Sequence, residues 1–152
     1  MYTSRFSIYP DVKQESSFLG YLVGLARKEN IEGWIIYPND DETVCLLAKH
    51  KKELEQYYRL ITPSWDVVKF AYDKRLTYEL ATKCGIAIPK TFYPRTMEEL
   101  EQLDIEFPAI IKASVKEPFY SRTRKKAIAV NDKKQLMDEY SRAVKLIAAH
   151  KH

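Results

Sequence analysis

The chain has 152 residues, enough for one ordinary domain or two very small ones. Apolar residues make up 45% of it and charged residues 30%, a composition that is typical of globular proteins and excludes a disordered tail. The net charge of +4 comes from 25 basic and 21 acidic residues, so charge alone does not indicate a nucleic-acid-binding protein.

The first part of the chain predicts strands and helices in alternation. Residues 5–9 alternate apolar and polar side chains, as an edge strand does, whereas residues 33–38 form a continuous apolar run that is typical of a buried parallel strand. Polar residues ahead of the helical patterns predict the N-caps. The expected elements are a strand over 5–9, a helix from Ser16 or Ser17 to Glu29, a strand over 33–38, a helix over 42–50 capped by Asn39, Asp40 or Asp41, a helical stretch over 53–58 and a strand over 59–62.

The second part of the chain predicts helices around two short strands. A helical pattern runs over residues 65–84 with a break near Asp73, and Gly85 is expected to stop it. Thr96 followed by Glu98 and Glu99 is typical of a capping box. Beyond that helix we expect an extended segment over 86–94, a short helix over 97–103, a strand over 107–112, a strand over 127–130 and a helix over 133–150 that buries Leu136, Tyr140, Val144, Leu146 and Ile147.

This order of elements predicts an α/β fold in two regions. Residues 1–63 are expected to form part of a doubly wound parallel sheet, because helices alternate with strands there. Residues 64–152 are expected to form a small α+β lobe, in which two strands are joined by a long loop. The boundary is expected at Pro63–Ser64.

Features that direct a chain to a membrane or out of the cell are missing from the sequence. The N-terminus has no apolar segment of signal-peptide length, and no apolar run approaches the roughly 18 residues of a membrane helix. Cys45 and Cys84 are isolated, which predicts reduced thiols, and the three histidines lack the spacing of a zinc site. We therefore expect a cytoplasmic protein with no metal site in this chain.

The most informative stretch for function is the basic segment 112–126. It has one acidic residue, Glu117, and two aromatic residues at its centre. Its cations can neutralise a polyphosphate and its aromatic side chains can cover it. A solvated hairpin without a ligand explains the same residues, and so does a groove for a single-stranded nucleic acid. The cations are Lys112, Lys116, Arg122, Arg124, Lys125 and Lys126.

Two other groups of charged residues have structural and functional interpretations. Asp73 and Lys74 stand early in a helix and, taken alone, predict weak surface ion pairs with Glu79 or Asp66. Residues 39–42 follow a strand at its carboxyl end, where open α/β sheets bind ligands, although helix capping explains them as well.

Taken in order, these motifs resemble the ATP-grasp superfamily, specifically its carbamoyl-phosphate-synthase-like and carboxylate–amine ligase-like members. The resemblance is carried by YDKRLTYELATKCGIAIPKTF at 72–92, EELEQLDIEFPAIIK at 98–112, KKAIAV at 125–130 and NDKKQLMDEY at 131–140. It extends upstream through 33–54 and 61–74, and so covers almost the whole chain. It implies that residues 1–63 are part of the domain that precedes the grasp and that residues 64–152 are the N-terminal ATP-grasp lobe.

The resemblance implies an ATP site. In such proteins the Lys of the DK element and the Lys that ends the FP-x-x-x-K strand contact ATP, and these positions are Lys74 and Lys112. The loop that follows the strand folds over the phosphates, which makes Lys116 and the cluster of cations up to Lys126 further ATP-binding candidates. The usual Gly-rich version of this loop is absent, so Lys and Arg side chains are expected to hold the phosphates in place of backbone amides.

The resemblance also implies a reaction class. In a complete relative, ATP phosphorylates a carboxylate, and an amine or another nucleophile then displaces phosphate from the acyl-phosphate. The family's metal-binding Glu and Asn, and the Arg that stabilises the acyl-phosphate, lie in a second lobe for which this chain has no matching residues. We therefore expect an ATP-binding fragment without assigned catalytic residues, inactive as a ligase on its own.

Other functions stay open from the sequence. A non-catalytic interaction or regulatory module on an ATP-grasp scaffold fits the same motifs, and a basic domain for single-stranded nucleic acid fits them less well. The expected partners are a nucleotide, a lobe or second chain that supplies the missing half, and further copies of this chain through the apolar surface left exposed.

Overall fold

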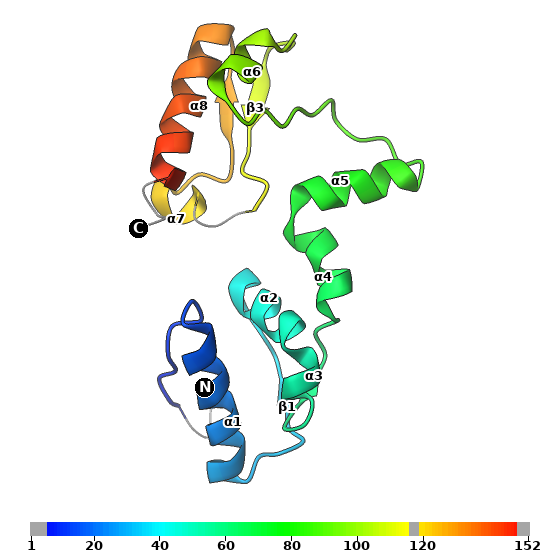
Figure 1. Cartoon of the computed structure of the whole chain (residues 1–152), viewed down its shortest axis with the longest axis vertical. Helices are drawn as coiled ribbons and strands as arrows, with labels where there is room; N and C mark the ends of the chain where they lie inside the picture. The colour runs from blue at the N-terminus through cyan, green and yellow to red at the C-terminus, as the bar shows by residue number, and fades with distance from the viewer. Residues whose placement is uncertain (1–5, 116–118, 149–152) are drawn as a thin grey trace. The chain divides into compact units, whose positions relative to one another are not determined.

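Helices and strands alternate in the computed structural model, which describes residues 6–115 and 119–148 and gives a mixed α/β fold, as predicted. The chain divides into two units, Met1–Tyr72 and Asp73–His152. The first unit contains α1 (Glu15–Glu29), β1 (Ile35–Ile36), α2 (Asp41–Lys49), α3 (Lys51–Leu54), β2 (Arg59–Leu60) and α4 (Trp65–Tyr72). The second unit contains α5 (Lys74–Lys83), α6 (Met97–Gln102), β3 (Ala109–Ile111), α7 (Phe119–Thr123), β4 (Ile128–Val130) and α8 (Lys133–Ala148) (Figure 1).

The first unit has a two-stranded parallel sheet beside a cluster of buried apolar side chains. Ile35 of β1 pairs with Arg59 of β2, and Ile36 pairs with Leu60. Ile36 and Leu60 pack against the cluster, whereas Ile35 is 49% exposed. The parallel strand predicted over 33–38 is confirmed, but its burial is wrong, because the described residues cover only one face of the sheet. The cluster consists of Phe18, Leu19, Leu46, Leu47 and Leu54.

The strand predicted over 5–9 is not formed by its described part. Residues 6–9 have no regular structure, and no described strand pairs with them. One of them contacts the first unit through its side chain, because the Tyr9 ring packs edge-on against Phe18 with 5.3 Å between the ring centroids. An alternating pattern therefore produced no strand where a partner strand was lacking. Residue 5 lies outside the described residues.

The start of α1 differs from the predicted one. The helix begins at Glu15, ahead of both Ser16 and Ser17, and Gln14 at the N-cap position makes no side-chain cap. The serine caps are therefore wrong. A turn in which the Gln14 N–H donates to the Asp11 carbonyl at 2.8 Å already bends the chain into the helix before either serine.

The second unit packs an antiparallel strand pair against two helices. Its core cluster joins Leu100 of α6, Val130 of β4 and Leu136 of α8. Figure 1 shows α6 and α8 beside β3. Thr96 caps α6 as predicted, because its Oγ accepts the Glu99 N–H at 3.1 Å. The strand register pairs Ala109 with Val130, Ile110 with Ala129 and Ile111 with Ile128, which confirms both predicted strands.

The buried face of α8 differs in part from the predicted one. Leu136 and Ala143 are each 6% exposed and Tyr140 is half-buried, which follows the i, i+4, i+7 spacing of one helix face. Val144 is 46% exposed and Leu146 is 38% exposed, so their predicted burial is wrong. The reason is that the face toward the core passes through Ala143, one residue before Val144.

The long helix predicted over 65–84 is interrupted where expected. Asp73 stands at the N-cap of α5, and Gly85 follows that helix with a φ of +70°, the left-handed conformation that favours glycine. The break also separates the two units, so α4 belongs to the first one, whereas the predicted boundary lies at Pro63–Ser64. The assignment of the two regions to parts of an ATP-grasp protein stays a prediction.

Candidate functional site

The β3–β4 hairpin brings two of the predicted ATP-binding lysines to one end of the sheet. Ile111 and Ile128 form the last pair of the register before the loop. Lys112 follows β3 directly, and Lys126 stands two residues before β4. Because the strands are antiparallel, the loop leaves and re-enters the sheet at the same end, next to these two lysines. Both side chains are exposed.

The outer face of this hairpin is apolar up to Lys112. Ala109 and Ile111 of β3 pack toward the core cluster, while Ile110 between them is 65% exposed. Side chains alternate along a strand, so Lys112 continues the outer row that contains Ile110. Ala129, which pairs with Ile110, is also exposed. The result is a small apolar surface with a cation at its loop end.

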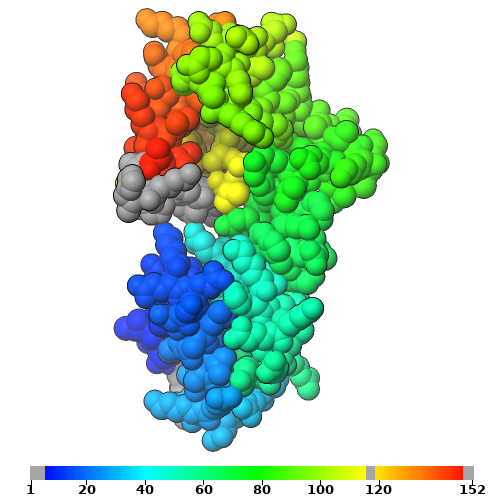
Figure 2. All heavy atoms as spheres, in the orientation of Figure 1, coloured from blue at the N-terminus to red at the C-terminus, as the bar shows by residue number. Residues whose placement is uncertain are grey.

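A backbone hydrogen bond ties the third predicted lysine to the same loop. Lys74 is the first residue of α5, and its N–H donates to the carbonyl of Ser114 at 3.0 Å. Ser114 lies two residues beyond Lys112. In Figure 2 the segment after β3, in yellow, reaches the surface beside the green start of α5. The structure thus gathers the backbones at Lys74, Lys112 and Lys126, while Lys116 lies outside the described residues.

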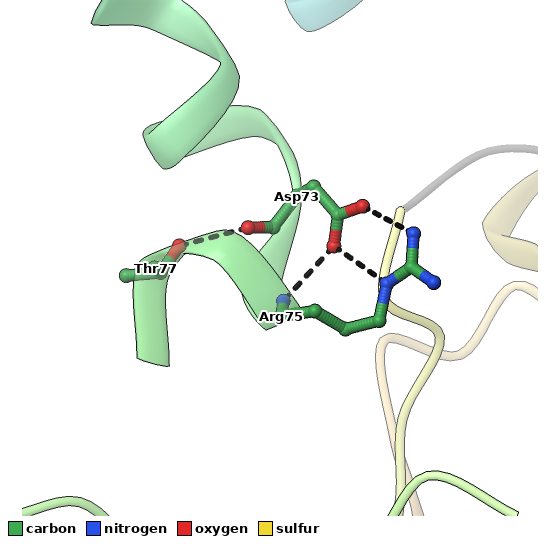
Figure 3. A network of polar contacts seen from close by, with 3 residues as sticks. All are labelled: Asp73, Arg75 and Thr77. Carbon is green, nitrogen blue, oxygen red and sulfur yellow. Dashed lines mark hydrogen bonds and ion pairs between the residues drawn. The ribbon is translucent and has the colours of Figure 1, made fainter. Parts of the chain in front are cut away.

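Asp73 organises the start of α5 (Figure 3). Its Oδ1 accepts the Arg75 N–H at 2.9 Å as an N-cap, and its carboxylate also binds the Arg75 guanidinium, with 2.7 Å from Oδ2 to Nη2. This hydrogen bond lowers the pKa of Asp73 and raises the pKa of Arg75. The predicted ion pair with Glu79 or Asp66, for which Lys74 would be the cation, is not formed among the described residues, because Asp66 binds Lys69 and the pair at this turn joins Asp73 to Arg75. Arg75 is occupied by this ion pair, which leaves Lys74 as the cation that this turn offers to a ligand.

The loop between the strands contains a short helix that the sequence pattern did not predict. Phe119 of α7 is 3% exposed, and α7 packs against α8. The Thr123 hydroxyl donates to the Phe119 carbonyl at 2.9 Å and closes the helix. The two aromatic residues at the centre of a basic stretch, Phe119 and Tyr120, are the signal that could have found it. The loop is therefore anchored to the core of the second unit.

The polar residues after β1 have a structural role. Asp40 caps α2, because its Oδ1 accepts the Thr43 N–H and its Oδ2 accepts the Thr43 hydroxyl, both at 2.8 Å. The capping interpretation is confirmed. Within residues 6–115 and 119–148, no three His, Cys, Asp or Glu side chains gather as metal ligands.

A shallow depression in the first unit contains none of the predicted site residues. It lies beside the end of α2 and the start of α4, where the Lys49 ammonium stands 5.4 Å from the centre of the Trp65 ring. The acids around it are partly paired: Lys51 binds Glu55 at 2.9 Å. Its mixture of charges favours no single ligand.

One curated protein is similar to part of this chain. Over 79 residues the chain is 40% identical to the carbamoyl phosphate synthase large chain of Myxococcus xanthus (strain DK1622), a match that covers 48% of this chain and 7% of that protein. No protein-family model and no solved structure matches the chain. The chain thus spans a small part of the relative's length. The similarity supports the resemblance to the ATP-grasp superfamily and nothing finer.

The described helices include no candidate for a membrane span. None of them combines the length and the apolar character that crossing a bilayer requires.

Proposed function

We propose that this chain is the ATP-binding part of an ATP-grasp protein of the carboxylate–amine ligase type. The observation that carries the proposal is the convergence on one loop: Lys112 and Lys126 stand at its two ends, and the backbone of Lys74 is bonded to Ser114 within it. The similarity to a carbamoyl phosphate synthase large chain supports the same class.

The donor set at this end of the hairpin fits a nucleotide. An adenosine triphosphate has an apolar base and a polyanionic tail, and the site offers an apolar outer face around Ile110 with exposed cations at its loop end. None of Lys74, Lys112 and Lys126 is bound to a carboxylate of a described residue. Their charges are therefore available to phosphate oxygens, with which a charge-assisted hydrogen bond is strong.

Each lysine has a defined task in this proposal. Lys112 meets the nucleotide where the apolar face ends, and Lys126 neutralises the phosphates from the other strand. Lys74 approaches from the start of α5, and Lys116 belongs to the same set by its position in the loop. When bound, ATP supplies the phosphoryl group that activates a carboxylate in a complete ligase of this class. A lobe outside the described residues, or a second chain, has to supply metal ligands and the carboxylate site.

Calorimetric titration of the chain with Mg-ATP tests the proposal. We expect measurable binding by the wild type and about tenfold weaker binding by Lys112→Ala, the loss of one charge-assisted hydrogen bond. The matched control is Lys134→Ala, which removes the same charge from an exposed position of α8 and leaves the affinity unchanged. No binding by the wild type, or equal affinities of the wild type and Lys112→Ala, would contradict the proposal.

A further inference from the structure

We infer that Arg124 is a phosphate ligand of the nucleotide site proposed above, and that the protein tolerates a strained backbone to keep an arginine there. The inference rests on the proposed function, and it selects one cation of the loop as a ligand on structural grounds. It begins with an unusual backbone conformation in the loop between β3 and β4.

Arg124 has a φ of +55°, in the left-handed region that long side chains avoid. Four described residues have a positive φ, and the other three are the residue types that accept it. Gly33 and Gly85 have no Cβ, and Asn30 is the C-cap of α1. At the end of α7, in the position where a helix usually has glycine, the chain has an arginine.

The backbone at this position is already used by the fold. The Arg124 N–H donates to the Tyr120 carbonyl at 2.8 Å, which closes α7, and the Lys125 N–H donates to the Thr123 hydroxyl at 3.1 Å. Glycine would make the first bond without strain. The arginine is therefore not explained by the backbone, which leaves its side chain as the reason for its presence.

The Arg124 side chain is exposed among like charges. It makes no ion pair with any described residue, whereas Arg75 and Arg142 in the same unit bind carboxylates at 2.7 and 2.8 Å. Its neighbours in the chain are Lys125 and Lys126, both exposed. Cations that follow one another along the chain repel one another, so an anion that binds them is favoured.

The loop presents this cation from an anchored support. Phe119 is buried in the second unit and α7 ends at Thr123, one residue before Arg124. A guanidinium held this way can offer two N–H groups to the oxygens of one phosphate, and less side-chain freedom is lost on binding than for a lysine. Polyphosphate is therefore the ligand chemistry that fits.

Two measurements separate strain from charge, because unfolding in urea responds to the strain and phosphate binding responds to the charge. Arg124→Gly removes both, and Arg124→Asn keeps a side chain that accepts the left-handed conformation. We expect Arg124→Gly to raise the folded-to-unfolded ratio of the second unit about fivefold in urea titrations. In calorimetry, both variants should bind Mg-ATP about tenfold more weakly than the wild type does. Their binding of tripolyphosphate should be weakened by the same factor. Asn30→Gly is the control for relief at a positive φ, and Lys134→Ala is the control for charge.

The outcomes distinguish the inference from the function on which it rests. If Lys112→Ala weakens Mg-ATP binding while Arg124→Gly binds like the wild type, the inference is overturned and the proposed function stands. If the wild type binds tripolyphosphate through Arg124 but does not bind Mg-ATP, the proposed function fails and the phosphate contact stands. If the wild type binds neither compound, both are overturned.

Discussion

Removal of the Asp73 carboxylate is the most direct test of how the start of α5 is held. The side chain is 13% exposed, caps α5 at 2.9 Å and binds the Arg75 guanidinium at 2.7 Å. Loss of an N-cap costs about 1 kcal/mol. Loss of the ion pair adds roughly 0.5 kcal/mol, because Arg75 is 55% exposed and solvent screens the attraction. We therefore expect Asp73→Ala to lower the free energy of unfolding of the second unit by about 1.5 kcal/mol.

Asp73→Asn is the matched variant, since asparagine is as good an N-cap as aspartate but carries no charge. We expect it to cost about a third of the Asp73→Ala change, the ion-pair part alone. Urea unfolding followed by far-ultraviolet circular dichroism measures both. Both tryptophans, Trp34 and Trp65, lie in the first unit, so their fluorescence reports whether the effect stays in the second. Equal costs of the two variants would refute the capping argument.

The difference in stability between the wild type and Asp73→Asn depends on pH with a defined sign. The hydrogen bond from Arg75 lowers the pKa of Asp73 below its ordinary value of 3.8. The unfolded state therefore takes up the proton first as the pH falls. The stability advantage of the wild type over Asp73→Asn is fully present above pH 3.8 and is lost as the pH falls through the folded-state pKa. An advantage that grew below pH 3.8 would contradict this sign.

Two further predictions concern the anchored loop and the uncovered sheet face. In urea titrations, Phe119→Ala should destabilise the second unit by about 3 kcal/mol, because it leaves a cavity, and Phe119→Leu should cost less than about 1.5 kcal/mol. A small effect of Phe119→Ala would show that packing does not anchor α7. The outer row of the parallel sheet exposes 49% of Ile35, 72% of Tyr37 and 55% of Ile61, so we expect concentration-dependent self-association in light scattering that Ile35→Lys reduces. A wild type that stays monomeric at high concentration would contradict it.

Local sequence patterns predicted where helices and strands form, but not which of their faces are buried or which strands find a partner. The apolar run over 33–38 and the short stretch over 59–62 indicated strands, and β1 and β2 within them are paired in parallel. The pattern could not reveal that Ile35 is half exposed, because burial depends on what covers the outer face of the sheet. Residues 6–9 show the same limit, since alternation describes a side-chain pattern while a strand also needs a partner for its backbone.

The candidate site likewise has features that the sequence predicted and features that it could not show. Lys74, Lys112 and Lys126 were predicted as ATP-binding residues because their positions match an ordered family pattern, and that role stays a prediction. The bond between the Lys74 N–H and the Ser114 carbonyl has no sequence signal, because it joins two backbone groups that every residue type has. The left-handed conformation of Arg124 is equally invisible, since the residue type itself disfavours it.

The loop over residues 112–126 has no glycine, which limits how it can bind a phosphate. A Gly-rich loop offers backbone N–H groups to phosphate oxygens. In this loop the N–H groups of Arg124 and Lys125 are already donated to Tyr120 and Thr123. Contacts to a phosphate at these positions must come from side chains, whose charges are screened by salt more strongly than a buried amide cradle. The affinity for a phosphate therefore depends on several cations lying close together. The anchoring of α7 keeps Arg124 beside Lys125 and Lys126, and so supports that affinity.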